Sequence, residues 1–360
     1  MRIGLYNPYL SSVVGGGERH FLTIAECLSL KHQVDVILNQ LDLKLKTKLE
    51  KTFNLDLKKV NFIQGPFNSS HSAKDRLNFT KNYHIFYYMT DGSFFVSKAQ
   101  KNIVHFQIPF KNSPKLFQRL KLKSWNIKTA NSNFTKNWLQ QKWKINIDYV
   151  HRGSVDTQNL KPAQKTNTII SVGRFISGQA GKHCKRQDFL VKTFKKMVDQ
   201  GLKNWRLVLI GPIEKGKDNL AFAKKVAQLA KAYPITIKHN SNFQQLAEDY
   251  SKAKIYWHAA GYGQDETINP QAVEHLGLTT AEAQSAGAVP VVINKGGQPE
   301  VVAHALNGLL WNTQPELINR TLELINNQAL WQKLSTKAIK NSVNFSKQKF
   351  CQLTNKIFSL

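Results

Sequence analysis

Residues 274–293 read EHLGLTTAEAQSAGAVPVVI, and this stretch decides the fold of the chain. Gly277 permits a tight backbone turn, and Thr279 or Thr280 can cap the start of a helix. The alanine-rich segment that comes next favours helix, with Gly287 as its C-terminal cap. The short apolar run at the end predicts a buried strand. The stretch therefore indicates a loop, a helix and a strand in succession.

Two carboxylates lie in this stretch at a spacing of eight residues. The pattern places Glu274 in the loop and Glu282 about two helical turns further on. Carboxylates accept hydrogen bonds from sugar or ribose hydroxyls, and a helix N-terminus offers free N–H groups to an anion. Together they indicate a pocket for a ligand with hydroxyls and phosphate, although two acids at this spacing alone are more often solvated surface residues.

Strand-like and helix-like segments alternate along the whole chain of 360 residues. Such alternation implies parallel sheets covered by helices on both faces. The predicted fold class is therefore α/β, with two Rossmann-like doubly wound domains. Strands are predicted at residues 2–7, 33–39, 60–64, 83–89, 103–108, 127–131, 147–151, 168–174, 205–211, 235–239, 255–258, 289–293 and 309–311. Helices are predicted at residues 18–30, 186–199, 219–232, 243–252, 280–286, 315–327 and 330–341.

A polar, irregular stretch divides the two halves of the chain. We predict an N-terminal domain of residues 1–155, a linker of 156–167 and a C-terminal domain of 168–340. The last segment, 341–360, is predicted to form a helix that packs back on the N-terminal domain.

The stretch around the two glutamates resembles glycosyltransferase family 4, the retaining nucleotide-sugar enzymes with the two-domain GT-B fold. Two Glu residues ahead of an alanine-rich helix and a Pro-Val-Val strand are the signature of that family, and residues 155–162 and 296–300 resemble further family segments. The resemblance implies two domains facing across a cleft. It also implies that the C-terminal domain binds a nucleoside-diphosphate sugar and the N-terminal domain binds the acceptor.

The resemblance assigns donor-binding roles to the C-terminal signature. Glu274 points toward the donor sugar and Glu282 toward the ribose, while the backbone N–H groups of Gly277, Leu278 and Thr279 face the diphosphate. Without the resemblance, these residues are ordinary parts of a loop and a helix start.

Two cations match the family residues that hold the leaving diphosphate. Arg174 ends a predicted strand, and Lys185 precedes the next helix. Negative charge builds on the diphosphate as the glycosidic bond breaks, so cations there stabilise the transition state. Lys182 is an alternative to Lys185, because the connecting segment carries extra residues. The alternative interpretation is an exposed basic loop, which the position at a strand end makes less favoured.

The resemblance also assigns residues in the N-terminal half. Gly16 and Gly17 match a glycine loop whose backbone lies against the donor, although a three-glycine turn is equally ordinary loop geometry. His105 matches a family histidine near the transferred sugar, but a lone His on an apolar strand is more often structural. Asp91 is an acceptor-side candidate, and Asp-Gly is also a common turn pair.

The formal net charge is +28, and no acidic residue lies between Asp91 and Asp148. This run mixes Lys and Arg with aromatic residues, which suits an anionic membrane surface or nucleic acid, or is simply a solvated basic face. We expect a peripheral protein at the inner face of the cell membrane. A basic nucleic-acid-binding protein and a non-transferase GT-B relative such as a phosphorylase remain alternatives.

Composition and spacing limit the remaining possibilities. The three cysteines are odd in number and unrelated in spacing, which argues against a disulfide framework or a zinc site and favours a cytoplasmic location. No acidic cluster has metal-ligand spacing, so we expect no metal and no cofactor. The chain is predicted to be a hexosyltransferase. GDP-mannose is the first expected donor and a UDP-sugar the second, with a hydroxyl of a glycan or lipid-linked acceptor in cell-envelope synthesis.

Overall fold

The computed structural model of the chain describes residues 1–10, 15–42, 44–178 and 183–359. It divides into two compact units. Unit 1 comprises Met1–Ser154 and Lys347–Leu360, and unit 2 comprises Val155–Ser346. Each unit is a parallel sheet with helices on both faces, so the predicted α/β fold class with two Rossmann-like domains is confirmed.

Unit 1 contains a seven-stranded parallel sheet in the order β3-β2-β1-β4-β5-β6-β7. The strand order reverses direction between β1 and β4, which is the topological switch point where such sheets bind ligands. The strands are β1 (Arg2–Tyr6), β2 (Gln33–Leu38), β3 (Val60–Gln64), β4 (Ile85–Met89), β5 (Lys101–Phe106), β6 (Ile127–Ala130) and β7 (Tyr149–Val150).

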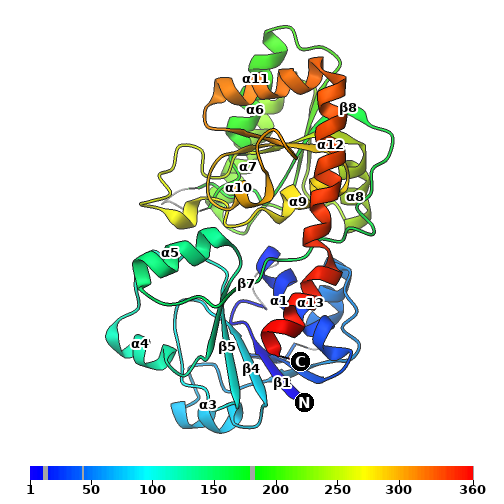
Figure 1. Cartoon of the computed structure of the whole chain (residues 1–360). Coiled ribbons are helices and arrows are strands. Elements are labelled where there is room, and N and C mark those ends of the chain that lie inside the picture. Colours follow the sequence, from blue (N-terminus) through cyan, green and yellow to red (C-terminus); the bar gives the residue numbers. More distant parts are fainter. Residues whose placement is uncertain (11–14, 43, 179–182, 360) are drawn as a thin grey trace. The chain divides into compact units, whose positions relative to one another are not determined.

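Helices cover both faces of this sheet (Figure 1). One face packs against α1 and the last helix of the chain, and the other carries a cluster of aromatic residues that includes Trp125 and Trp143. The helices are α1 (Gly16–Ser29), α2 (Leu45–Phe53), α3 (Ala73–Thr80), α4 (Leu116–Leu122), α5 (Asn133–Trp143) and α13 (Lys347–Phe358).

Unit 2 contains a six-stranded parallel sheet in the order β10-β9-β8-β11-β12-β13, whose switch point lies between β8 and β11. Its strands are β8 (Thr166–Val172), β9 (Arg206–Ile210), β10 (Ile235–Lys238), β11 (Ala253–His258), β12 (Val289–Ile293) and β13 (Leu309–Trp311). Its α-helices are α6 (Gln187–Asp199), α7 (Lys217–Ala230), α8 (Phe243–Lys252), α9 (Leu278–Ser285), α10 (Gln298–Val301), α11 (Gln314–Asn326) and α12 (Gln328–Ser342).

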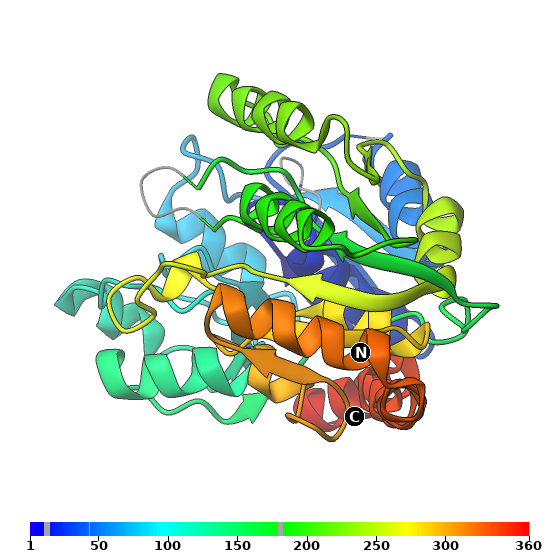
Figure 2. The ribbon, with the colours of Figure 1, turned by 90° about the horizontal axis from the view of Figure 1, so that it is seen from above.

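The two faces of this sheet have separate cores. Side chains of α6, α7, α11 and α12 pack on one face around Trp257 and Trp311, and Figure 2 looks onto this side with α6 in green and α11 in orange. The opposite face packs against α8, α9 and α10 through smaller residues such as Ala281 and Ala283. Because both faces are covered, the strands are almost continuously apolar.

The signature helix begins two residues before the predicted start at residue 280. Helix α9 begins at Leu278, and its N-cap is Gly277 at φ +98°, not a threonine. Thr280 instead donates its hydroxyl hydrogen to Oε1 of Gln298 at 2.9 Å. The left-handed backbone at Gly277 turns the loop into the helix without a capping side chain, and Gly287 at φ +76° follows the helix end.

The expectation of no disulfide was also wrong, because Cys27 and Cys351 form one. The bond joins α1 to α13, and Cys184 is the free, buried cysteine. The two bonded residues are 324 positions apart, so spacing could not reveal the pair. The odd cysteine count therefore carries no information about the compartment.

Helix α13 is attached to unit 1 by further contacts. Lys347 forms an ion pair with Glu26 of α1 at 2.5 Å, and Nζ of Lys101 donates to the carbonyl oxygen of Phe358 at 2.9 Å. Phe350 and Phe358 are buried in the unit 1 core. Residues 155–167 belong to unit 2, so the segment predicted as a linker is part of that compact unit.

Among the described residues, no helix is both long enough and apolar enough to pass through a bilayer.

We predict that oxidised protein, denatured without reductant, reacts with a thiol label at Cys184 alone, whereas reduced protein reacts at three cysteines. Reduction should lower the free energy of unfolding of unit 1 by about 3 kcal/mol, because the cross-link limits the unfolded chain. A Cys184→Ser variant should show the same sensitivity to reductant as the unmodified chain, and a Cys351→Ser variant should show none. Three labelled cysteines in unreduced protein would contradict the bond.

Candidate functional site in unit 2

Glu274 is the centre of a cluster at the switch point of unit 2. Its Oε2 atom forms an ion pair with Nζ of Lys185 and lies 2.9 Å from Nε2 of His258. His258 ends β11, and Lys185 follows β8 in the connection to α6. The carboxylate therefore joins the carboxyl ends of the two strands at which the strand order reverses, where open α/β sheets bind ligands.

The Gly296–Gly297 turn holds the loop of Glu274 in place. The N–H of Gly297 donates to the carbonyl oxygen of Glu274 at 2.7 Å. A Cβ atom at Gly296 would lie 2.1 Å from that oxygen, and one at Gly297 would lie 2.2 Å from the carbonyl oxygen of His275. Only glycine permits this close approach of two backbones, which explains the glycine pair.

The charge of Glu274 is stabilised by its neighbours. Burial alone would raise its pKa, but the Lys185 ammonium and the hydrogen bond from His258 hold the pKa of Glu274 well below its usual range. Its side chain is 14% exposed. The residue is therefore an anion at neutral pH in a partly desolvated position, where an unpaired carboxylate would be costly.

Two histidines complete the cluster. Burial lowers the pKa of His258, so its ring is neutral at pH 7. Because the Glu274 carboxylate only accepts, Nε2 of His258 carries the proton and donates it. Nδ1 of His183 donates to the carbonyl oxygen of Val273 at 3.0 Å, which fixes its Nε2 3.9 Å from Glu274.

Glu282 lies on α9 and is 8% exposed. The hydroxyl of Tyr250 donates to its Oε2 atom at 3.1 Å and is 3.3 Å from the carbonyl oxygen of Thr279. The hydroxyl of Tyr256 forms a hydrogen bond with the hydroxyl of Thr279 at 2.8 Å. Burial, opposed by the Thr279 hydrogen bond and reinforced by the charges of Glu274 and Glu282, raises the pKa of Tyr256. The charges of both glutamates act on Tyr256, so Glu274 and Glu282 lie in the same region of unit 2.

Arg174 forms an ion pair with Glu214 at the carboxyl end of β8. Its Nη1 atom donates to Oε2 of Glu214 at 2.7 Å, and its side chain is 35% exposed. The amide of Gln187 donates to the carbonyl oxygens of Gly173 and Arg174 at 3.1 Å, which fixes the end of β8 against α6. Lys182, the alternative to Lys185, lies outside the described residues.

The predicted residues of unit 1 gather at its own switch point. Gly16 and Gly17 begin α1 after β1, and Asp91 follows β4. A Cβ atom at Gly17 would lie 3.3 Å from Cγ of Gln107. Oδ1 of Asp91 accepts hydrogen bonds from the Tyr88 hydroxyl and from the backbone N–H of Ser93, both at 2.9 Å. Asp91 therefore also stabilises the turn after β4.

His105 is fully buried and both of its ring nitrogens are in use. Nδ1 is 2.8 Å from the Thr129 hydroxyl, and Nε2 is 3.0 Å from Oε1 of Gln107. Its ring stacks on His20 at 4.4 Å, and His151 lies edge-on to His20 at 4.8 Å. This geometry suits a structural role, and a contact of His105 with the transferred sugar stays a prediction.

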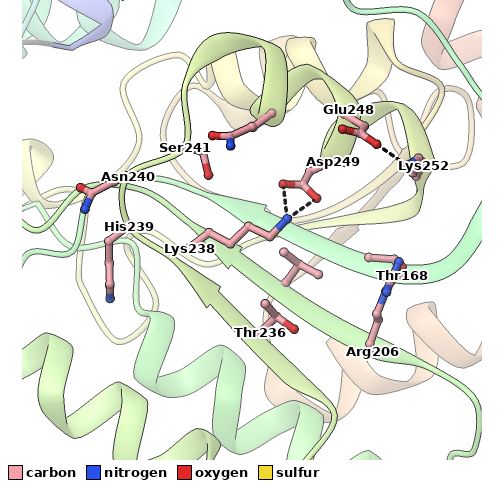
Figure 3. A pocket seen from close by; sticks show the side chains of 12 residues that line it. Thr168, Arg206, Thr236, Lys238, His239, Asn240, Ser241, Glu248, Asp249 and Lys252 are labelled. Carbon is pink, nitrogen blue, oxygen red and sulfur yellow. Dashed lines mark hydrogen bonds and ion pairs between the residues drawn. The ribbon is translucent and has the colours of Figure 1, made fainter.

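A polar groove of about 630 Å³ lies along the β8-β9-β10 side of unit 2 (Figure 3). Figure 3 shows Lys238 reaching Asp249 on α8, with both carboxylate oxygens 2.8 Å from Nζ. Arg206 donates to the Thr168 hydroxyl at 2.8 Å on the neighbouring strands. None of the predicted site residues that the structure describes lines this groove.

A smaller cavity of about 240 Å³ lies closer to the Glu274 cluster. Gly261, Gln264 and Ala272 of the loop after β11 line it together with Cys184 and Arg186, which flank Lys185 in the sequence. Arg186 donates to the carbonyl oxygen of Tyr262 at 2.6 Å and so ties the two loops together. Across the described parts of the chain, His, Cys, Asp and Glu side chains form no group of three suited to a metal ion.

The two Rossmann-like units, one of which has a cation–carboxylate cluster at its switch point, have the two-domain fold of GT-B glycosyltransferase structures. The model of the family described as Glycosyl transferases group 1 matches residues 155–343, which is more than half of the chain. The chain belongs to the group 1 glycosyltransferases. The match includes Arg174, Lys185, Glu274 and Glu282.

Individual relatives share less sequence. A probable sucrose-phosphate synthase of Vicia faba is 36% identical over 88 residues, which are 24% of this chain and only 8% of that relative. A glycosyltransferase structure from Rickettsia africae is 18% identical, with a TM-score of 0.74, over 99% of this chain and 98% of the other. The structure of Anabaena HepE in complex with UDP and glucose is 17% identical, with a TM-score of 0.71, over 100% and 99%. These two structures share the fold.

We predict that unit 1 loses stability as the pH falls below about 6.5. Burial lowers the pKa of His105 to about 4 and of His151 to about 3, and it lowers the pKa of His20 well below its usual value. Since the unfolded chain binds protons from about pH 6.5 downward, each neutral histidine costs about 1.4 kcal/mol per pH unit until its folded pKa is reached.

Urea unfolding of unit 1 at several pH values measures this slope. His20→Leu is the informative variant, because neither ring nitrogen of His20 has a hydrogen-bond partner among the described residues. The variant should fold and should flatten the slope by about 1.4 kcal/mol per pH unit. A stability that does not change between pH 6.5 and about 5 would show that these histidines bind protons as readily in the folded protein as in the unfolded chain.

Proposed function

We propose that the chain is a retaining glycosyltransferase of family 4 that moves a hexose from a nucleoside-diphosphate donor to a hydroxyl of a glycan or lipid-linked acceptor. The single observation that carries the proposal is the ion pair of Lys185 with Glu274 at the β8/β11 switch point. Both residues lie inside the matched family segment. The ammonium group suits the diphosphate of an activated sugar, and the carboxylate suits the hydroxyls of the sugar. Unit 2 would bind the donor, and unit 1 would bind the acceptor.

The two candidate diphosphate-binding cations of unit 2 are each paired with a carboxylate. Lys185 pairs with Glu274, and Arg174 pairs with Glu214. A donor diphosphate would bring negative charge to both cations and release the two carboxylates. Glu274 could then accept hydrogen bonds from hydroxyls of the sugar, while the cations stabilise the charge that develops on the departing diphosphate.

Helix α9 supports the same assignment. Its first N–H groups, from Leu278 and Thr279, cannot bond within the helix, and Gly277 supplies no capping side chain. The N-terminus of a helix is favourable for phosphate. Glu282 lies further along the helix, beside Tyr250, and would accept hydrogen bonds from the ribose. In the proposed mechanism the acceptor attacks the face of the sugar from which the diphosphate leaves, and no metal takes part.

The donor has two candidates. The sequence around Glu274 favours GDP-mannose, while a structure of the same fold binds UDP and glucose and so favours a UDP-hexose. We propose that the acceptor belongs to the cell envelope and is met at the inner face of the membrane, which is consistent with the basic character of residues 92–147.

We predict that Arg174→Ala, Lys185→Ala and Glu274→Gln each lower sugar transfer about 100- to 1,000-fold, because each removes a charge from the proposed donor site. The assay measures release of GDP from GDP-mannose or of UDP from UDP-hexoses with lipid-linked glycan acceptors. Lys225→Ala, on the exposed side of α7, is the matched control and should be fully active.

Thermal unfolding of every variant separates lost chemistry from lost folding, because Glu274→Gln leaves Lys185 without its counter-charge. Near-normal transfer by both Arg174→Ala and Glu274→Gln, in folded protein, would refute the assigned site. Transfer with inversion at the anomeric carbon would refute the retaining mechanism alone.

A further inference from the structure

Helix α4 exposes three neighbouring apolar side chains. Leu116, Phe117 and Leu120 are 75%, 68% and 52% exposed. Leu120 is four residues after Leu116 and three after Phe117, and both spacings place side chains next to each other on a helix, so the three form a single patch. Leu122, on the inner side of the helix, is buried in the unit 1 core. The helix therefore turns one apolar side inward and a second one toward solvent.

The patch is held outward by the structure beneath it. Oε1 of Gln118 accepts a hydrogen bond from the backbone N–H of Phe94 at 2.7 Å, and Nε of Arg119 donates to the carbonyl oxygen of Pro114 at 3.3 Å. Trp125, just after the helix, is fully buried. These contacts and the burial of Leu122 fix the orientation of α4 on unit 1.

All charged residues that neighbour the patch in the sequence are cationic. Lys115, Lys121 and Lys123 flank or interrupt the apolar residues, and no acidic residue occurs between Asp91 and Asp148. Nζ of Lys121 lies 4.6 Å from the centre of the Phe117 ring. An apolar patch with a positive rim is complementary to a surface that offers acyl chains beneath anionic headgroups.

The structure also distinguishes between the two partners that the basic, aromatic sequence suits, namely nucleic acid and an anionic lipid surface. Binding of single-stranded nucleic acid needs exposed aromatic rings on which bases stack. Of the aromatic residues between Asp91 and Asp148, all of which are described, Phe117 is the exposed one, while Trp125 and Trp143 are interior. Two of the three exposed side chains are leucines, which give bases nothing to stack on. The surface therefore fits lipid better than nucleic acid.

We propose that α4 is a membrane-binding element, whose Leu116, Phe117 and Leu120 side chains enter the headgroup region of an anionic phospholipid bilayer. Lys115, Lys121 and Lys123 contact the lipid phosphates. This inference goes beyond the proposed transfer reaction and does not depend on it, because membrane binding can be measured without any sugar donor or acceptor.

Flotation with vesicles tests the proposal. The full chain should float with vesicles of phosphatidylglycerol and phosphatidylcholine in about 0.1 M NaCl and not with phosphatidylcholine alone. Binding should fall in about 1 M NaCl, where the Debye length shortens from about 10 Å to about 3 Å. The triple variant Leu116→Ser, Phe117→Ser, Leu120→Ser should lose about tenfold or more in bound fraction, because it removes the apolar surface that enters the bilayer.

The matched control is Leu30→Ser, Leu220→Ser, Leu306→Ser, which removes three exposed leucines from separate places. It should float like the unchanged chain, and both triple variants should keep the same melting temperature. Equal flotation of the α4 variant and the control would overturn the proposal. So would the absence of binding to anionic vesicles, or retention on single-stranded polynucleotide without vesicle binding.

Discussion

The ion pair between Lys185 and Glu274 is the interaction on which the site of unit 2 depends. A carboxylate that is 14% exposed is costly unless it is paired, and here a cation from the β8 end and a histidine from the β11 end both reach one oxygen. The pair therefore holds two loops from different strands together at the switch point. The Gly296–Gly297 turn adds the third support, because it packs directly on the backbone of the same glutamate.

This arrangement explains how a strongly basic protein keeps cations ready for an anionic ligand. Lys185 and Arg174 each have a carboxylate partner, Glu274 and Glu214, so an ion pair holds each side chain in place. Positioning in advance lowers the entropy that binding would otherwise cost. A diphosphate can replace each carboxylate with a stronger anionic partner, and the released Glu274 is then available to hydroxyl groups. In our account, donor binding is an exchange of ion-pair partners.

The strand positions, the parallel α/β fold class and the signature loop could be predicted from sequence because they follow from local patterns, namely apolar runs, glycine turns and the alternation of elements. The partners of the signature residues could not. His258, Tyr250 and Glu214 come from other elements or loops, 16, 32 and 40 residues from Glu274, Glu282 and Arg174, and no local sequence signal marks them as partners. The Cys27–Cys351 bond was missed for the same reason, since it depends on the return of α13 to unit 1. Helices α2 to α5 were missed because their apolar faces are weak or short.

The most direct test of the exchange of partners is calorimetric binding of GDP and UDP to the full chain, to Lys185→Met and to Glu274→Gln. The account predicts opposite effects for the nucleotide that binds. Lys185→Met should weaken its binding about tenfold or more, because a cation is lost, whereas Glu274→Gln should bind it at least as tightly as the unchanged chain, because Lys185 is freed. Equal weakening by both substitutions in folded protein, or no effect of Lys185→Met, would contradict the central claim.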